Sequence, residues 1–150
     1  MSKEYSAINN FLVTVFNEIL RTEEASLKTK EFKNLSVREM HVIEAVCDAT
    51  ENKKNTASEI ALSQKITAGT LTTAISILEK KGYVIRHRDD TDKRVVRIFP
   101  TEKGKTANEV HQSFHHEMVS SIMSVLQGDE LAMFVKGLGA VQQFLEGSKR

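Results

Sequence analysis

The sequence predicts a mainly α-helical protein with one small β-hairpin, arranged as a winged helix-turn-helix with further helices at its N- and C-terminal ends. Two observations predict the winged part: two short helical segments joined by a tight turn (57–62 and 67–81), and two β-rich runs around a charged tip (83–88 and 95–99). Long amphipathic segments before and after it (5–27 and 101–145) predict the terminal helices. Spacings of three and four residues indicate helix, and short β-branched runs indicate strand.

The 150 residues, 40% of them apolar, fit one domain with helical appendages. No run of 18 apolar residues indicates a membrane span, and the N-terminal MSKEYSAINN lacks the apolar stretch of a secretion signal. Cys47 is the only cysteine, which excludes an intramolecular disulfide and leads us to expect a reducing cytoplasm.

Two helices are predicted before residue 50. The first runs from Tyr5 to about Leu27, and the second begins at a capping box in which Ser36 and Glu39 satisfy each other's backbone N–H groups. The apolar face of the first helix is Ile8, Leu12, Val15 and Ile19, widened by Phe11 and Phe16, and that of the second is Met40, Ile43 and Cys47.

The two short helices of the predicted helix-turn-helix follow a polar break at residues 50–55. Thr56 and Glu59 form a second expected capping box, which opens a short helix through Ile60 and Leu62. After a turn at 63–66, Thr67 caps the next helix and Gly82 ends it in a left-handed conformation. Its buried stripe is Leu71, Ala74, Ile75 and Leu78.

The remaining chain is predicted as a hairpin with its tip at 89–94, a long helix and a last helix. Pro100 lies where the strand pattern gives way to a helical one, Thr101 opens the long helix, and Gly128 and Asp129 separate the two helices. The apolar positions are Ala107, Val110, Phe114, Met118, Ile122 and Val125 in the first, and Leu131, Phe134, Leu138, Val141 and Leu145 in the second.

Charge is unevenly distributed along the chain, although the net charge is only +1. Residues 65–105 carry ten Lys or Arg against five acidic residues, and the rest of the chain is net acidic. A local basic segment indicates contact with a polyanion, although a solvated charged surface would give the same count.

The second helix of the pair exposes hydroxyl groups beside this basic hairpin. Ser and Thr are poor helix formers, so their clustering on one face favours hydrogen bonding to base edges in a DNA major groove over a merely solvated face. Arg94 at the hairpin tip is flanked by Lys93, with Arg88 and Arg97 on the strands, and it is suited to entering a narrow minor groove and contacting the phosphates beside it. Asp92 can orient its guanidinium; the alternative for Asp92 and Arg94 is an ordinary surface ion pair. The residues that we predict to contact DNA are Ser58, Thr67, Gly69, Thr70, Thr72, Thr73, Ser76, Arg88, Asp92, Lys93 and Arg94.

At these residues the sequence resembles the MarR family of winged-helix transcriptional regulators. The run 66–84 resembles that family's recognition helix, 89–94 its wing, and 101–104 the start of its fifth helix; Pro100 departs from the aliphatic residue commoner there. The resemblance implies a non-enzymatic homodimeric repressor that reads a palindrome in double-stranded DNA. We place one domain over 1–150, with the winged part at about 36–100 and dimerisation helices at about 4–30 and 101–146. The terminal apolar stripes independently favour a dimer over closure onto a single winged domain.

Histidines on two predicted helices raise the question of a zinc effector. His111 and His115 are four residues apart and face one side of a helix, which is a spacing that can offer two imidazoles to one metal. Together with His41 and Glu24 (or Glu23), they resemble the site of zinc-responsive MarR repressors. The alternative is that no metal binds and the histidines make ordinary hydrogen bonds.

A second resemblance is to MarR-type repressors of fatty-acid synthesis genes. It rests on residues 35–43, 114–119, 136–138 and 143–146, and it implies a pocket for the acyl chain of acyl-acyl carrier protein, acting as corepressor. The residues that could line such a pocket are Phe16, Leu20, Met40, His41, Ile43, Phe114 and Met118, which are otherwise plain core residues.

Three other functions are disfavoured. Cys47 has no neighbouring Lys or Arg to stabilise a thiolate, which argues against peroxide sensing. The sequence has no Gly-rich phosphate loop, G-x-S-x-G turn, H-E-x-x-H motif or calcium-loop spacing, so an enzyme is not expected. A protein-interaction module would explain the helices but not the Thr-rich face beside a basic hairpin.

Overall fold

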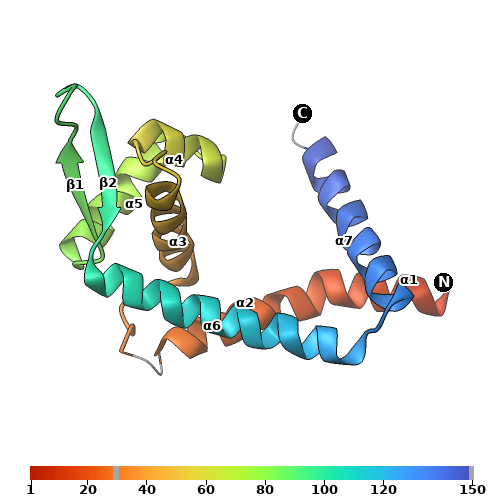
Figure 1. Cartoon of the computed structure of the whole chain (residues 1–150). Helices are drawn as coiled ribbons and strands as arrows, with labels where there is room; N and C mark the ends of the chain where they lie inside the picture. The colour runs from red at the N-terminus through yellow and green to blue at the C-terminus, as the bar shows by residue number, and fades with distance from the viewer. Residues whose placement is uncertain (29–30, 149–150) are drawn as a thin grey trace. The chain divides into compact units, whose positions relative to one another are not determined.

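The computed structural model describes residues 1–28 and 31–148 (Figure 1). The elements in chain order are α1 (Lys3–Asn10), the π-helix η1 (Phe11–Val15), α2 (Phe16–Lys28), α3 (Val37–Glu51), α4 (Ala57–Gln64), α5 (Ala68–Lys80), β1 (Val84–Arg88), β2 (Val96–Pro100), α6 (Glu102–Val125) and α7 (Asp129–Gly147). They form two compact units, Met1–Ser113 and Phe114–Arg150, called here the first and second units. Residues 29–30, where we placed the end of the first dimerisation segment, lie outside the described residues.

The first predicted helix is helical throughout but is not a single α-helix. Ser2 caps its start by accepting a hydrogen bond from the Tyr5 amide at 3.1 Å. At η1 the hydrogen bonds switch from the α to the π pattern for five residues before α2 resumes. Apolar spacing does not reveal a π segment, because the side chains on either side still recur at intervals of three and four.

α3 begins as predicted. The Ser36 hydroxyl accepts from the Glu39 amide at 3.1 Å, and the Glu39 carboxylate accepts from the Ser36 amide at 3.0 Å, which completes the capping box. Met40, Ile43 and Val46 are fully buried, and Cys47 is 8% exposed. This helix therefore contributes the central face of the first unit's core.

The second expected capping box is only half formed. Thr56 accepts from the Glu59 amide at 3.2 Å, but the Glu59 carboxylate accepts from the Thr56 hydroxyl at 2.7 Å and not from its backbone. The Thr56 backbone instead forms an isolated antiparallel bridge with Arg97. The start of α4 is thus joined to β2.

α5 is positioned by a left-handed residue and two threonines. Lys65 adopts φ +56° at the end of α4, and Thr67 then caps α5 by accepting from the Thr70 amide at 3.1 Å. Leu71, Ile75 and Leu78 are buried, as the stripe predicted. Ala74, the fourth member of that stripe, is half-buried.

The hairpin follows Gly82, whose φ of +87° gives the predicted left-handed stop. β1 and β2 are antiparallel, with Val84 opposite Pro100 and Arg88 opposite Val96, so Pro100 is the last strand residue. β1 packs beside α5 and β2 beside α3 (Figure 1). At the base of the hairpin, a Cβ on Gly104 would lie 2.2 Å from the Tyr83 carbonyl oxygen, so the crossing of α6 over this strand requires glycine.

The second unit contains the C-terminal part of α6 and the whole of α7. No residue of α7, Asp129–Gly147, is buried. Large apolar side chains are exposed along α7, among them Phe134, Leu138 and Phe144. Within the parts of the chain that the structure describes, no helix combines the length and hydropathy needed to cross a bilayer.

Candidate nucleic-acid interface

The hydroxyl-bearing face of α5 is exposed, as the sequence predicts. Thr67, Gly69, Thr70, Thr72 and Thr73 are all exposed, and so is Ser58 on α4. The hydroxyls of Thr72 and Thr73 donate back to the carbonyls of Ala68 and Gly69, at 2.8 and 3.1 Å. Because each donated proton is used within the helix, these two oxygens are left as acceptors, suited to amino-group donors on base edges.

The hairpin tip, residues 89–94, presents a pre-oriented arginine. Asp92 holds Arg94 through two contacts, Nε to Oδ1 at 3.0 Å and Nη2 to Oδ2 at 3.1 Å, while the Arg94 side chain remains 90% exposed. The hydrogen bonds from Arg94 hold the pKa of Asp92 below its ordinary value. Lys93 and Arg88 are also exposed. Three cations therefore extend from this tip and its adjoining strand.

Asp89 organises the backbone of the tip. Its carboxylate accepts from Arg97 Nε at 2.7 Å, from the Thr91 hydroxyl at 2.5 Å and from the Asp92 amide at 3.1 Å. The hydrogen bond from Arg97, followed by that from Thr91, holds the pKa of Asp89 far below its ordinary value. Arg97 also donates to Asn55 Oδ1 at 3.2 Å. The Arg97 guanidinium therefore braces the wing.

Ser76 differs from the other predicted contact residues on α4 and α5. It is half-buried, and its Oγ accepts from Arg86 Nη2 at 2.8 Å. Arg86 was not among the residues predicted to have a role, although its place in β1 two residues after buried Val84 puts both on the same face of the strand. The alternation of faces along this strand was the sequence signal that could have pointed to an inward-facing Arg86.

The α2–α3 connection is joined to the end of α5. Lys81 Nζ donates to the Asn34 carbonyl at 2.5 Å and to Glu39 at 2.8 Å, and the Tyr83 hydroxyl donates to Asn34 Oδ1 at 2.6 Å. Burial alone would raise the pKa of Glu39, but hydrogen bonds from Lys81 and Ser36 outweigh it and lower that pKa. Lys103 Nζ lies 4.5 Å from the centre of the Tyr83 ring. These polar contacts fix the C-terminal end of α5.

The residues predicted to hold an acyl chain lie in different environments. Met40 and Ile43 are fully buried in the core of the first unit, whereas Phe16 is 52% exposed. Leu20 is half-buried and His41 exposed on the same unit, and Phe114 and Met118 belong to the second unit. The acyl pocket as a whole stays a prediction.

Glu23, His41 and His111 meet in the first unit. Glu23 Oε1 lies 3.1 Å from His41 Nε2 and 3.1 Å from His111 Nδ1, and His111 Nε2 lies 2.5 Å from Glu44 Oε2. Glu23 is thus the carboxylate beside these histidines in the first unit, whereas Glu24, the other residue considered, is half-buried and pairs with Lys28 at 3.5 Å. Glu23 is one helical position away, a rotation of about 100°, and points inward. His115 belongs to the second unit.

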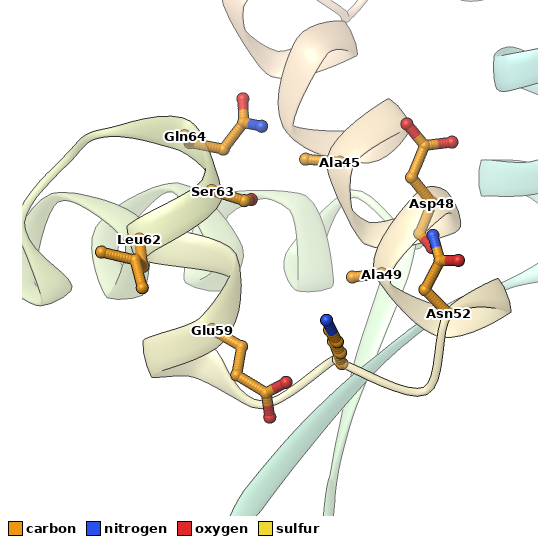
Figure 2. A pocket seen from close by; sticks show the side chains of 9 residues that line it. Ala45, Asp48, Ala49, Asn52, Glu59, Leu62, Ser63 and Gln64 are labelled. Atoms are coloured by element: carbon orange, nitrogen blue, oxygen red, sulfur yellow. The ribbon is translucent and has the colours of Figure 1, made fainter.

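Two hollows flank α4. One, of about 540 Å³, lies between α3 and α4, with Asp48, Glu59 and Leu62 around it (Figure 2). The other, of about 700 Å³, lies between α3 and α5 and includes His41, Ile66 and Ile77. His41 is the one residue of the predicted acyl set that lines either hollow.

A winged helix-turn-helix with a hydroxyl-lined helix beside a cationic hairpin defines the class of the protein: a DNA-binding transcriptional regulator rather than an enzyme. Residues 43–96 match the MarR family. The chain is similar to FabT of Streptococcus pneumoniae, solved in complex with DNA, with 37% identity, a TM-score of 0.85, and coverage of 97% of this chain and 99% of that one. The chain therefore belongs to the MarR family.

Other relatives agree with this assignment. The transcriptional repressor YetL of Bacillus subtilis is 29% identical over 107 residues, which cover 71% of this chain and 64% of YetL. The chain thus matches less than two thirds of that relative's length. The DNA complex of Staphylococcus aureus MepR, at 20% identity and a TM-score of 0.70 over 94% of this chain and 97% of that one, shows the same fold.

Proposed function

We propose that the chain acts as a homodimeric, sequence-specific repressor that reads a palindrome in double-stranded DNA. The observation that carries the proposal is the pairing of two exposed features on one unit: the acceptor hydroxyls of Thr72 and Thr73 on α5, and the Arg94 guanidinium held by Asp92 on the wing. The first suits base edges in a major groove, and the second suits a narrow minor groove.

Exposed apolar side chains support the dimer. Along α1 and η1, Ile8, Phe11 and Leu12 are 41–60% exposed, and a separate apolar row follows α7. Monomeric proteins rarely leave whole helical faces of this kind in water. A second copy related by a two-fold axis would cover them and place two recognition helices about one DNA turn, roughly 10 bp, apart.

For the regulated genes, we propose fatty-acid biosynthesis, with long-chain acyl-acyl carrier protein as corepressor. Support comes from the motifs at residues 35–43 and 114–119 and from the near full-length similarity to FabT. A regulator of this kind would act in the cytoplasm, where both DNA and the acyl carrier are present.

Zinc responsiveness is the second candidate, because Glu23, His41 and His111 converge within hydrogen-bonding distance. Two imidazoles and a carboxylate are ligands that suit zinc, so the residues fit the ion chemically. Glu23, His41 and His111 would hold the metal, which would tie α2, α3 and α6 together. The competing proposal is that the same groups form a hydrogen-bonded network without metal.

One binding experiment separates these proposals. A duplex enriched by the purified protein from random sequence is titrated with the protein alone, with long-chain acyl-acyl carrier protein, with unacylated carrier, and with a zinc chelator. Tightening by the acylated carrier alone, with indifference to chelator, supports the lipid proposal. Loss of binding on chelation, restored by added zinc, supports the metal proposal. The absence of any salt-sensitive duplex binding would overturn the repressor function itself.

A further inference from the structure

We propose that Arg86 is a positioning residue that clamps the wing to the recognition helix, and that this clamp determines sequence discrimination more than overall DNA affinity. The inference rests on the proposed DNA-binding function. The clamp consists of Arg86 on β1 and three residues of α5 whose oxygen atoms accept its hydrogen bonds: Thr72 through its carbonyl, and Ser76 and Glu79 through their side chains.

The contacts extend along two turns of α5. Arg86 Nη2 donates to the Thr72 carbonyl at 3.1 Å and to Ser76 Oγ at 2.8 Å, and Nη1 donates to Glu79 Oε1 at 3.1 Å. Glu79 Oε2 accepts from the Arg86 backbone amide at 3.1 Å. The three acceptor residues are four and three positions apart, so they lie on one face of the helix, and this face is the one turned toward β1.

The chemistry of the site requires arginine. The planar guanidinium presents several N–H donors in a fixed fork, and two of its nitrogens reach three acceptors here. A lysine keeps the positive charge but has a single nitrogen, which cannot reach the same acceptors from the same strand position. The charge and the geometry can therefore be separated experimentally.

The clamp holds the part of α5 that we expect to read bases. Thr72 has its carbonyl bound to Arg86 while its hydroxyl faces solvent, and Ser76 is occupied by the same guanidinium. In this proposal Ser76, which was predicted to contact DNA, serves the clamp. Because α5 and Arg94 must enter two different grooves together, a fixed angle between helix and wing favours the duplexes whose groove geometry fits both.

A measurement without DNA tests the mechanical part. Spin labels are attached at cysteines replacing the exposed Lys80 and Lys93, one at the end of α5 and one at the wing tip; the native Cys47 is buried. Arg86→Lys should broaden the distance distribution between the labels. Arg88→Lys, an exposed arginine on the same strand, is the matched control and should leave it unchanged. Equal distributions in all three proteins would overturn the clamp.

A DNA measurement tests the functional part. The affinity for a duplex enriched by the wild-type protein is compared with that for a scrambled duplex of equal length. Arg86→Lys should lower the ratio of the two affinities by about tenfold, with little change for the scrambled duplex. Glu79→Gln should also lower the ratio, and the double variant should fall less than the two single effects combined, because both changes break one unit.

The results that would contradict the inference differ from those that would contradict the proposed function. If Arg86→Lys weakens both duplexes equally, or neither, Arg86 acts as a phosphate contact or a passive strand residue, and the inference is wrong. If the wild-type protein enriches no duplex at all, the proposed function fails, and so does the discrimination part of the inference. The label experiment would then still decide whether the clamp exists.

Discussion

The Asp92 carboxylate accepts two hydrogen bonds from the guanidinium of Arg94, while the Arg94 side chain stays 90% exposed. An isolated surface ion pair of this kind contributes little to folding stability. If Arg94 enters DNA as proposed, the pair would order this long side chain before binding and so reduce the entropy lost on binding.

Asp92→Asn should therefore weaken binding to the enriched duplex by about three- to tenfold, although the change removes a negative charge near DNA, because Arg94 loses its orientation. Binding to a scrambled duplex should stay equal or become tighter, since electrostatics then dominate. Fluorescence anisotropy with both duplexes measures this. Tighter binding to the enriched duplex would show that the pair has no orienting role.

Arg94→Ala should weaken binding to the enriched duplex and reduce the slope of log affinity against log salt by about one, because one cationic contact is lost. The comparison variant is Lys53→Ala, an exposed lysine on the turn between α3 and α4, outside the predicted contact set. Unchanged affinity with an unchanged slope in Arg94→Ala would remove the wing from the interface.

Thr72→Val combined with Thr73→Val should reduce discrimination between the enriched and scrambled duplexes by about tenfold, because each change removes a hydroxyl while keeping side-chain volume. Thr106→Val is the matched control. Thr106 is an exposed α6 threonine whose hydroxyl also donates back four residues, to Glu102 at 3.0 Å. Retained discrimination in the double variant would mean that another face of α5 reads the bases.

The wing should lose its fixed structure at low pH. The pKa of Asp89 is lowered in the folded protein, first by the Arg97 hydrogen bond, so the stabilisation is fully present above the ordinary Asp value of about 3.9 and is lost as pH falls from there through the lowered folded-state pKa. The NMR signal of Arg97 Nε–H reports this transition. Asp89→Asn should remove the transition, and a pH-independent signal in the wild type would contradict the assignment.

Gly104→Ala should lower the free energy of unfolding by about 2–4 kcal/mol, since the new methyl would meet the Tyr83 carbonyl. That carbonyl accepts from the Thr101 amide at 3.0 Å, so it cannot move without breaking the contact. Gly139→Ala in α7, where a Cβ meets no atom within 4 Å, is the control. Chemical denaturation compares the two, and equal stability would show that the crossing relaxes at no cost.

Local signals in the sequence predicted the fold well. Ser36 and Thr67 cap helices where expected, Gly82 ends α5, and three of the four residues in the predicted stripe of α5 are buried. These features depend on residues within a few positions of one another, where backbone hydrogen bonding limits the alternatives.

Features that depend on long-range pairing were missed. The ties of Arg86 to α5 and of Arg97 to Asn55 join segments whose relative placement follows from tertiary packing. The choice between Glu23 and Glu24 was open in the sequence for a similar reason, because adjacent helix residues face directions about 100° apart and packing alone decides which one points inward. The contact residues on DNA and the acyl pocket stay predictions.

The π-helical stretch Phe11–Val15 has a consequence for the N-terminal surface. Such a stretch behaves as one residue inserted into an α-helix, and it offsets the flanking helical faces by roughly a quarter turn. Ile8 on α1 and Ile19 on α2 are eleven residues apart, a spacing that would place them on one face of a continuous α-helix. Because of the π-helical stretch, they lie on different faces. A single-residue deletion within this stretch would restore an unbroken α-helix and still leave the two side chains on different faces, because a separation of ten residues turns through about 1,000°, about 80° short of three full turns.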